Sequence, residues 1–205
     1  MKKILLSLLL TFSVITNANY EADVDYVVFD KPVKTVTGDK VEVRELFWYY
    51  CPHCFDIEPL IKNWLKDMPS SAQFVRQPAV FSDRWISGAI FYYVLEQLGE
   101  VNRLHEVLFH AIHAEKEAFI GSEDFVEWLV EHGVDKAKAE NAFKSFSVRV
   151  KVNQSKVNTK KYKGLNGVPA FVVAGKYLVD TKHAGSENRM FDVINYLIKK
   201  ETKVE

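Results

Sequence analysis

The sequence predicts an α/β domain that carries an all-helical insertion. Runs of β-branched and aromatic residues, which are typical of strands, occur before residue 78 and return after residue 164. Between residues 82 and 158 the chain shows no convincing strand, only the spaced apolar positions of amphipathic helices. No internal repeat and no low-complexity linker divides it. Strands at both ends around a helical middle indicate one sheet-containing domain interrupted by the insertion.

The strands follow from local composition and turn signals. The segment 41–49 is almost continuously apolar at its far end, as expected for a strand buried on both faces of a sheet. Gly175 lies in a short connection between two apolar runs, which predicts a hairpin. The expected strands span residues 24–29, 41–49, 72–77, 170–173 and 177–179.

The helices follow from apolar periodicity and from capping residues. Ser122 is a good N-cap and Gly133 a good C′ residue, so these two residues bound one helix. Ser186 caps the last helix, whose basic end at Lys199 suits the helix dipole. The first helix shows its periodicity over residues 55–67, and the other expected helices span residues 83–98, 101–113, 122–133, 135–146, 148–162 and 186–199.

Residues 1–18 have the features of a cleavable secretory signal peptide. Lys2 and Lys3 precede an apolar run at 4–15, and Ala18 supplies a small residue for cleavage. The alternative is a membrane anchor, but the run is shorter than the roughly 20 residues needed to span a bilayer. We therefore expect an exported protein.

Composition limits the possible functions of the mature chain. Residues 1–18 hold two lysines and no acid, so 25 basic residues face 27 acidic ones, a formal net charge of −2. Nucleic-acid binding normally requires a clear basic excess, so it is not expected. With 48% hydrophobic and 13% aromatic residues, the chain can build a substantial core.

The only two cysteines lie in Cys51-Pro52-His53-Cys54, between an expected strand and an expected helix. A structural disulfide is the alternative to a redox role. It would close only a very small loop, and so would contribute little stability through chain entropy. A reactive pair is the better interpretation.

The position of the pair favours a thiolate on Cys51. As the helix N-cap, Cys51 would face free backbone N–H groups and the positive end of the helix dipole. Pro52 suits the first helical position, and His53 adds a possible cation. A lowered thiol pKa stabilises the reduced form and makes the disulfide more oxidising. Cys54, one turn into the helix and less exposed, would resolve the mixed disulfide.

A metal site is the competing hypothesis. Zinc usually needs about four ligands, and a second cysteine pair is absent from the sequence. His105, His110 and His113 lie in one helical stretch and could contribute, but histidines half-buried in a helix or on its surface are commoner. No metal is expected.

These motifs together resemble the DsbA thiol–disulfide oxidoreductases. The resemblance is based on Cys51-Pro52-His53-Cys54, on Gly167-Val168-Pro169 and on the Ala-Phe-Val-Val-Ala-Gly-Lys-Tyr run that follows, and it covers essentially the whole mature chain. It implies a thioredoxin fold with an all-helical domain inserted after the third strand. The implied division is 1–18 signal peptide, 19–81 and 151–205 discontinuous thioredoxin-like domain, and 82–150 inserted domain.

The resemblance also assigns further site residues. It implies that Val168–Pro169 is a cis peptide bond facing the cysteines, where the backbone of Val168 can pair with an extended substrate. From the residues alone, Glu45 is either exposed near a sheet edge or placed for a function, because a buried unpaired carboxylate is costly. The resemblance makes Glu45 a buried acid near Cys54 that tunes the dithiol and passes protons.

Two further charged residues match positions of the family. Glu58 matches an acidic position, although a solvated helix face explains Glu58 nearly as well. Arg76 is the candidate partner of Glu45, and a fixed positive charge there should keep the Glu45 carboxylate ionised. Phe47, Trp48, Tyr49 and Tyr50 are expected to be mostly core packing.

We therefore predict a periplasmic enzyme that donates its disulfide to newly exported reduced proteins. It would need no cofactor besides its cysteine pair, would act as a monomer, and would be reoxidised by a membrane quinone reductase of the DsbB type. A disulfide isomerase is the closest alternative, but isomerases usually carry a dimerisation domain ahead of the thioredoxin unit. A holdase that grips unfolded chains at Val168-Pro169 is the alternative without redox chemistry.

Overall fold

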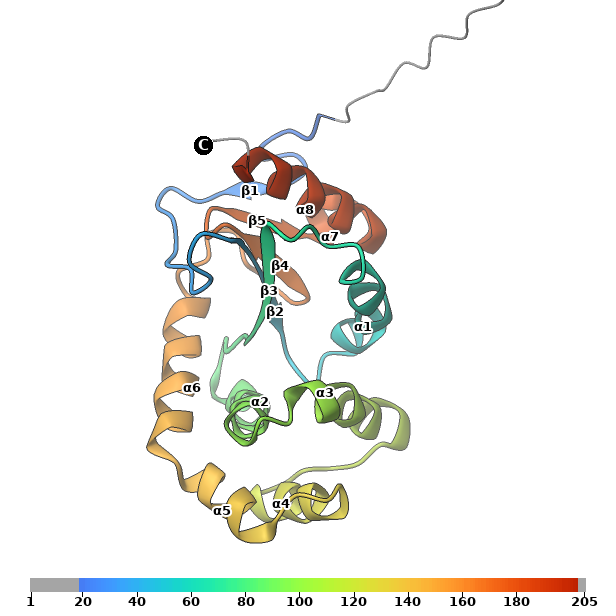
Figure 1. Cartoon of the computed structure of the whole chain (residues 1–205), viewed down its shortest axis with the longest axis vertical. Coiled ribbons are helices and arrows are strands. Elements are labelled where there is room, and N and C mark those ends of the chain that lie inside the picture. Colours follow the sequence, from blue (N-terminus) through green and yellow to red (C-terminus); the bar gives the residue numbers. More distant parts are fainter. Residues whose placement is uncertain (1–18, 203–205) are drawn as a thin grey trace, which may run out of the picture.

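In the computed structural model, which describes residues 19–202, a five-stranded mixed sheet forms the centre of the molecule (Figure 1). The spatial order is β1-β5-β4-β2-β3. The central strand β2 runs parallel to β3 and antiparallel to β4, and the pairs β4–β5 and β1–β5 are also antiparallel. The strands are β1 (Val27–Val28), β2 (Val41–Phe47), β3 (Ala72–Pro78), β4 (Ala170–Val173) and β5 (Tyr177–Asp180).

Helices cover one face of this sheet. α1 (Pro52–Trp64) and α8 (Glu187–Thr202) pack there with the short α7 (Thr181–Ala184), and Figure 1 shows the three on the same side. The core between them is formed by apolar side chains from α1, α8 and four strands, among them Ile57, Ile61, Val43, Ala72, Phe171, Val179, Ile194 and Leu197. A smaller core on the opposite face contains Leu46, Val172, Leu178 and Tyr162.

The middle of the chain forms a helical bundle beyond one end of the sheet, and α6 returns along the side of the sheet (Figure 1). Aliphatic and aromatic side chains together form the core of this bundle, and Phe47, Tyr49 and Cys54 join it from the sheet side. Its elements are η1 (Asp83–Trp85), α2 (Ile86–Leu98), α3 (Val101–His110), the π-helical turn η2 (Ala111–Glu115), α4 (Ser122–Glu131), α5 (Lys136–Lys144) and α6 (Phe146–Thr159). The predicted α/β architecture with a helical insertion is confirmed.

Several predicted boundaries are wrong. The first strand was expected at 24–29 but is only Val27–Val28, because a turn closed by the Asp23 N–H and the Tyr26 carbonyl precedes it. β2 ends at Phe47 rather than residue 49, and α1 ends at Trp64 rather than residue 67. α7 was not predicted, because four residues are too few to show a helical period.

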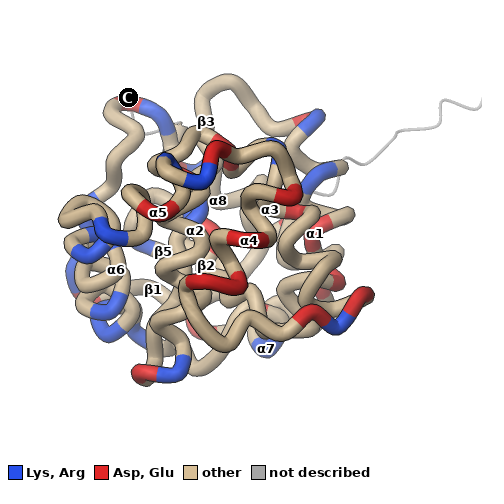
Figure 2. Tube along the Cα trace, turned by 90° about the horizontal axis from the view of Figure 1, so that it is seen from below, with Lys and Arg blue, Asp and Glu red and all other residues tan. Residues whose placement is uncertain are grey.

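Charge is unevenly distributed over the surface. No acidic residue lies between Glu140 and Asp180, and Figure 2 shows the resulting basic side of the molecule along α6. Two α6 lysines form ion pairs there, Lys151 with Glu96 and Lys156 with Asp83. Such exposed pairs contribute little to stability.

The predicted signal peptide lies outside the described residues. Within residues 19–202, no helix combines the length and the apolar character needed to cross a bilayer.

Candidate active site

The cysteine pair lies where β2 leads into α1, between the sheet and the helical bundle. β2 ends at Phe47, and a turn follows in which the Cys51 N–H donates to the Trp48 carbonyl at 3.0 Å. Cys51 is the N-cap of α1, with extended backbone angles, and Pro52 is its first residue. The predicted cap and first helical position are both confirmed, and proline fits because the N–H at that position needs no partner.

The two cysteines have different surroundings. Cys51 is half-buried, whereas Cys54 is fully buried in the core shared with the helical bundle. The pKa of Cys51 is lowered to about 6 by a hydrogen bond from the Cys54 thiol, against the opposing effect of its burial, and by the backbone N–H groups of Cys54 and His53 together with the charge of His53. Burial raises the pKa of Cys54 well above its usual value, and the hydrogen bond to Cys51 and the charge of Cys51 act in the same direction. At neutral pH the reduced pair therefore holds one thiolate, on Cys51.

The loop before β4 faces Cys51. The Val168–Pro169 peptide bond is cis, as the family resemblance implied. The Cys51 sulfur lies 3.4 Å from the Val168 carbonyl oxygen, a distance at which a protonated thiol donates a weak hydrogen bond. A backbone acceptor next to the reactive sulfur is available to an extended chain that approaches Cys51.

Glu45 lies in the central strand β2 and its side chain is 0% exposed, so the alternative of an exposed edge position is wrong. The Arg76 Nε approaches Glu45 Oε2 to 2.9 Å, which confirms the predicted partner. This approach lacks hydrogen-bond geometry, and neither Glu45 oxygen accepts a hydrogen bond from the residues that the structure describes. The carboxyl group is thus paired with the Arg76 cation through a poorly aligned contact.

The expectation that Arg76 keeps Glu45 ionised is wrong. Arg76 also donates from Nη2 to Glu58 Oε2 at 2.9 Å, so two carboxyl groups share one guanidinium. Burial raises the pKa of Glu45 to about 8, the nearby charge of Arg76 opposes this rise, and the negative charge of Glu58 adds to it. Glu58 is itself buried, because α1 packs against α3 as well as the sheet, so the solvated-face explanation of Glu58 is also wrong.

Two residues of this cluster were not identified from the sequence as parts of the site. His105 of α3 is buried between Glu58 Oε1 (3.1 Å from Nε2) and the Tyr49 hydroxyl (2.8 Å from Nδ1). Tyr49, expected to be core packing, is fully buried as predicted but also has this polar contact. His105 lies next to Leu104 and three residues before Leu108 in the apolar stripe of its helix. This position was a signal in the sequence that His105 is buried.

The other histidines of this stretch do not gather around a common point. His113 Nε2 lies 2.7 Å from the Tyr49 carbonyl oxygen, and the His113 ring stacks on Phe55 at 5.2 Å. His110 pairs with Glu115 at the surface. Among residues 19–202, no group of three or more histidine, cysteine or acidic side chains is arranged to hold a metal ion.

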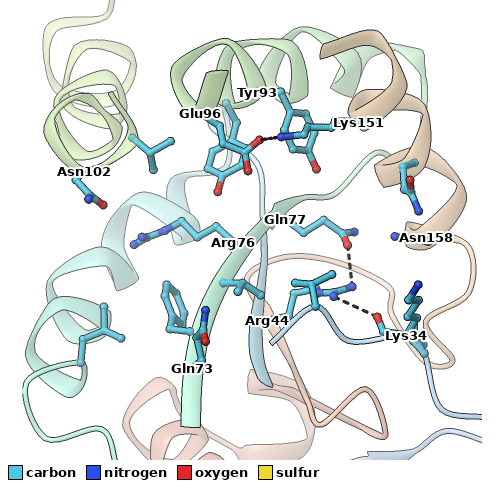
Figure 3. A pocket seen from close by; sticks show the side chains of 18 of the residues that line it. Lys34, Arg44, Gln73, Arg76, Gln77, Tyr93, Glu96, Asn102, Lys151 and Asn158 are labelled. Atoms are coloured by element: carbon cyan, nitrogen blue, oxygen red, sulfur yellow. Dashed lines mark hydrogen bonds and ion pairs between the residues drawn. The ribbon is translucent and has the colours of Figure 1, made fainter. Parts of the chain in front are cut away.

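A groove of about 930 Å³ runs beside the outer strand β3, and Figure 3 shows Arg76 and Gln77 directed into it. Arg76 is 17% exposed, so the groove brings solvent to one side of the buried acid cluster. Deeper in the sheet, Arg44 forms a separate buried network with Glu42 (2.6 Å) and the Tyr162 hydroxyl (2.9 Å). No sequence pattern indicated this second network.

A dithiol at a strand–helix junction, with one activated and one buried sulfur and a cis-proline loop facing it, defines a thiol–disulfide oxidoreductase of the thioredoxin class. Comparison with known proteins agrees. The sequence model of the family described as "DSBA-like thioredoxin domain" matches residues 61–190. The chain is 36% identical to the thiol:disulfide interchange protein DsbA of Pseudomonas aeruginosa over 183 residues, which cover 89% of this chain and 86% of that protein.

A second relative and a solved structure extend the match. The thiol:disulfide interchange protein DsbA of Burkholderia cepacia is 35% identical, over 97% of both chains. The crystal structure of Pseudomonas aeruginosa DsbA superposes with a TM-score of 0.82 at 37% identity, over 89% of this chain and 95% of that one. The chain belongs to the DsbA family, with a thioredoxin fold interrupted by helices, and it is a thiol–disulfide oxidoreductase.

Proposed function

We propose that the protein donates its Cys51–Cys54 disulfide to reduced proteins exported to the periplasm. The observation that carries this proposal is the contrast between the two sulfurs, with the pKa of Cys51 lowered to about 6 and that of the buried Cys54 raised. A thiolate that is stable in the reduced protein favours the reduced state, and so makes the disulfide a strong oxidant. A thiolate with a low pKa is also a good leaving group from a mixed disulfide.

The reaction proceeds in two exchanges. A substrate thiolate attacks the Cys51 sulfur, a substrate–Cys51 bond forms, and the Cys51–Cys54 bond breaks with the electron pair on Cys54. A second thiolate of the substrate then attacks the substrate sulfur that is bonded to Cys51, forms the substrate disulfide and expels Cys51 as a thiolate. The substrate has lost two electrons, and the Cys51–Cys54 pair has gained them. The Val168 backbone next to Cys51 pairs with the extended substrate during both steps.

Glu45 supplies the proton that the first exchange requires. Cys54 leaves as a thiolate in a buried position where the charged form is disfavoured, so it must be protonated. Glu45, with its pKa raised to about 8, still carries a proton at neutral pH, and its negative charge after donation acts on Cys54. Solvent in the groove beside Arg76 then restores the proton on Glu45. His53 and Pro52 act by favouring the Cys51 thiolate and by starting α1 there.

The remaining parts of the proposal follow from family membership. A membrane quinone reductase of the DsbB type reoxidises the pair, the protein acts as a monomer, and the cysteine pair is its only redox group. Residues 1–18 direct export. The thioredoxin-like domain comprises 19–81 and 151–205, and the inserted domain 82–150.

Disulfide transfer to a reduced peptide with two cysteines tests the proposal. The oxidised protein should produce one peptide disulfide per molecule, and thiol counting by mass spectrometry should find two new thiols on the enzyme. Cys51→Ser and Cys54→Ser each lack one sulfur of the disulfide, so neither variant should produce any peptide disulfide. A Cys51→Ser/Cys54→Ser protein that still prevented aggregation of unfolded chains and promoted their folding as well as the wild type would instead support the holdase.

A further inference from the structure

His105 connects the helical bundle to the acid cluster beneath the dithiol. Its Nε2 lies 3.1 Å from Glu58 Oε1, and its Nδ1 lies 2.8 Å from the Tyr49 hydroxyl oxygen. Its ring packs edge-on against Phe47 and Phe109, each at 5.1 Å between centroids. Both ring nitrogens have polar partners and the ring is enclosed, so the imidazole has one position.

The partners determine which nitrogen of His105 carries the hydrogen. Burial lowers the pKa of His105, so the ring is neutral at physiological pH. Burial opposes ionisation of Glu58, but the hydrogen bond from His105 and the charge of Arg76 outweigh it and lower the pKa of Glu58. An ionised Glu58 can only accept, so Nε2 carries the hydrogen and Nδ1 accepts from the Tyr49 hydroxyl. A chain of donors therefore runs from Tyr49 through His105 to Glu58.

The two acids next to Arg76, Glu58 and Glu45, differ in their hydrogen bonds. Glu58 accepts one hydrogen bond on each oxygen, from His105 and from Arg76 Nη2. Glu45 has only the poorly aligned contact with Arg76 Nε at 2.9 Å and no second donor among residues 19–202. A buried cation with two carboxyl groups is best neutralised by one negative charge, so one proton remains in the cluster at neutral pH.

We propose that His105 is a positioning residue that decides which acid holds this proton: its hydrogen bond keeps Glu58 ionised and leaves the proton on Glu45. The inference rests on the proposed function only for its consequence, because it is Glu45 that would protonate Cys54. If His105 could not donate, Glu58 would keep only the Arg76 bond, and the proton would move towards Glu58. Arg76 would then pair with an ionised Glu45, which could no longer protonate Cys54.

Other charged or titratable groups face His105 from each neighbouring element. They are Glu58 on α1, Tyr49 after β2, Arg76 on β3, Tyr92 on α2 and Glu106 on α3, and Glu45 on β2 is linked to them through Arg76. Glu106 forms an ion pair with Lys62 at the surface. Burial raises the pKa of Tyr49, and it raises that of Tyr92 beyond the physiological range, so neither tyrosine titrates with the cluster. The proton equilibrium thus involves the two glutamates and the histidine.

The inference gives the inserted helices a chemical role. α3 contributes no group to the sheet, yet it carries the donor that sets the protonation of an acid on the central strand β2. In this protein the helical bundle would therefore act on the dithiol as well as cover it.

Site-resolved titration of the carboxyl carbons tests the proposal. The reduced full-length protein, labelled with ¹³C at glutamate side chains, is followed by NMR from pH 5 to 9, with Glu45→Gln and Glu58→Gln used to assign the two signals. In the wild type, Glu58 should be ionised throughout and Glu45 should titrate near pH 8. His105→Leu should shift the proton equilibrium between the two acids towards Glu58 by roughly tenfold to a hundredfold, the usual effect of a hydrogen bond to a charged group.

Two conservative variants separate the hydrogen bond from packing. His105→Gln keeps an N–H donor for Glu58 and should restore the wild-type order of titration. Tyr49→Phe removes the donor to Nδ1, frees the tautomer, and should move the proton in the same direction as His105→Leu but less far. If His105→Leu does not fold, Tyr49→Phe decides. Unchanged Glu45 and Glu58 titrations in whichever of these variants fold, or a Gln variant that behaves like Leu, would overturn the proposal.

Turnover gives an independent readout. In the wild type, part of the single-turnover rate of disulfide transfer depends on protonated Glu45. This part should fall as Glu45 ionises, with a midpoint near pH 8. In His105→Leu this midpoint should move to lower pH. Failure of disulfide donation in the wild type would refute the proposed function but would leave the carboxyl titrations, which need no substrate, to decide the role of His105.

Discussion

Acidification should weaken the preference of the dithiol for the reduced state, with a break near pH 6. Reduction of the disulfide by glutathione, a thiol of ordinary pKa near 8.5, leaves Cys54 protonated because the pKa of Cys54 is raised. Above pH 6 Cys51 is left as a thiolate and one proton is released, whereas below pH 6 both thiols stay protonated. The equilibrium constant for reduction should rise about tenfold per pH unit between about pH 6.5 and 8, and become flat below about pH 5.5.

The magnitude follows from the shift at Cys51. Lowering the pKa from 9.0 to about 6 favours the reduced protein about elevenfold at pH 7, which is about 1.4 kcal/mol or roughly 30 mV for a two-electron couple. Cys51 is only half-buried and solvent screens part of the interaction, so this value is an upper bound. Because the folded pKa lies below the unfolded one, the contribution to the stability of the reduced protein is complete above about pH 9 and is lost as the pH falls through 6.

The assay is equilibration in glutathione buffers from pH 5 to 8, followed by acid quenching, alkylation and thiol counting by mass spectrometry. The ultraviolet absorbance of the thiolate, measured against Cys51→Ser, gives the same pKa independently. An equilibrium constant that does not change with pH in this range, or that rises only above pH 8, would refute the argument that the helix N-terminus and its neighbours stabilise a Cys51 thiolate.

Two further predictions concern stability. The pKa of Glu45 is raised from 4.5 to about 8, so the folded protein keeps a proton that the unfolded chain loses, and the contribution of Glu45 to stability falls as the pH rises from 4.5 towards 8. In that window the stability of Glu45→Gln should gain about 1.4 kcal/mol per pH unit relative to the wild type. Urea unfolding that shows the same difference between the two proteins at pH 5 and at pH 8 would contradict this. A Cβ on Gly175 would lie 2.1 Å from the Val33 carbonyl oxygen, whereas one on Gly38, also at positive φ, meets nothing within 4 Å. Gly175→Ala should therefore cost about 3 kcal/mol or more and Gly38→Ala about 1 kcal/mol in the same unfolding experiment, and equal losses would show that only the backbone angle matters.

The dithiol could be predicted from the sequence because its determinants are local. A strand-like run, a cysteine at a cap position and a proline at the first helical position are neighbours in the chain, and they fix the geometry around Cys51 and Cys54. The boundaries were less accurate. The end of β2 depends on a turn whose closing bond, from the Cys51 N–H to the Trp48 carbonyl, the sequence pattern does not show.

The acid cluster was only partly predictable, because it is assembled from distant segments. The partner of Glu45 followed from family resemblance and lies opposite it in the parallel register of β2 and β3, where Glu45 pairs with Arg76. Glu58 was assigned to a possible solvated face because periodicity shows one buried face of a helix, whereas α1 is covered on two sides. His105 was considered only as a metal ligand, since its contacts with Glu58 and Tyr49 depend on how α3 docks.

The energetics of the site explain why the acid matters more to one cysteine than to the other. Cys51 can keep its negative charge, because a thiol, two backbone N–H groups and His53 favour it. Cys54 has no such surroundings, and each disulfide exchange that leaves an electron pair on its sulfur requires a proton in a place where water does not reach it. A carboxyl group with an ordinary pKa would be ionised at pH 7 and could not supply that proton. Burial raises the pKa of Glu45 enough to retain the proton, Arg76 opposes this rise, and the negative charge of Glu58, which shares Arg76, adds to it, so burial together with Glu58 makes Glu45 useful to Cys54.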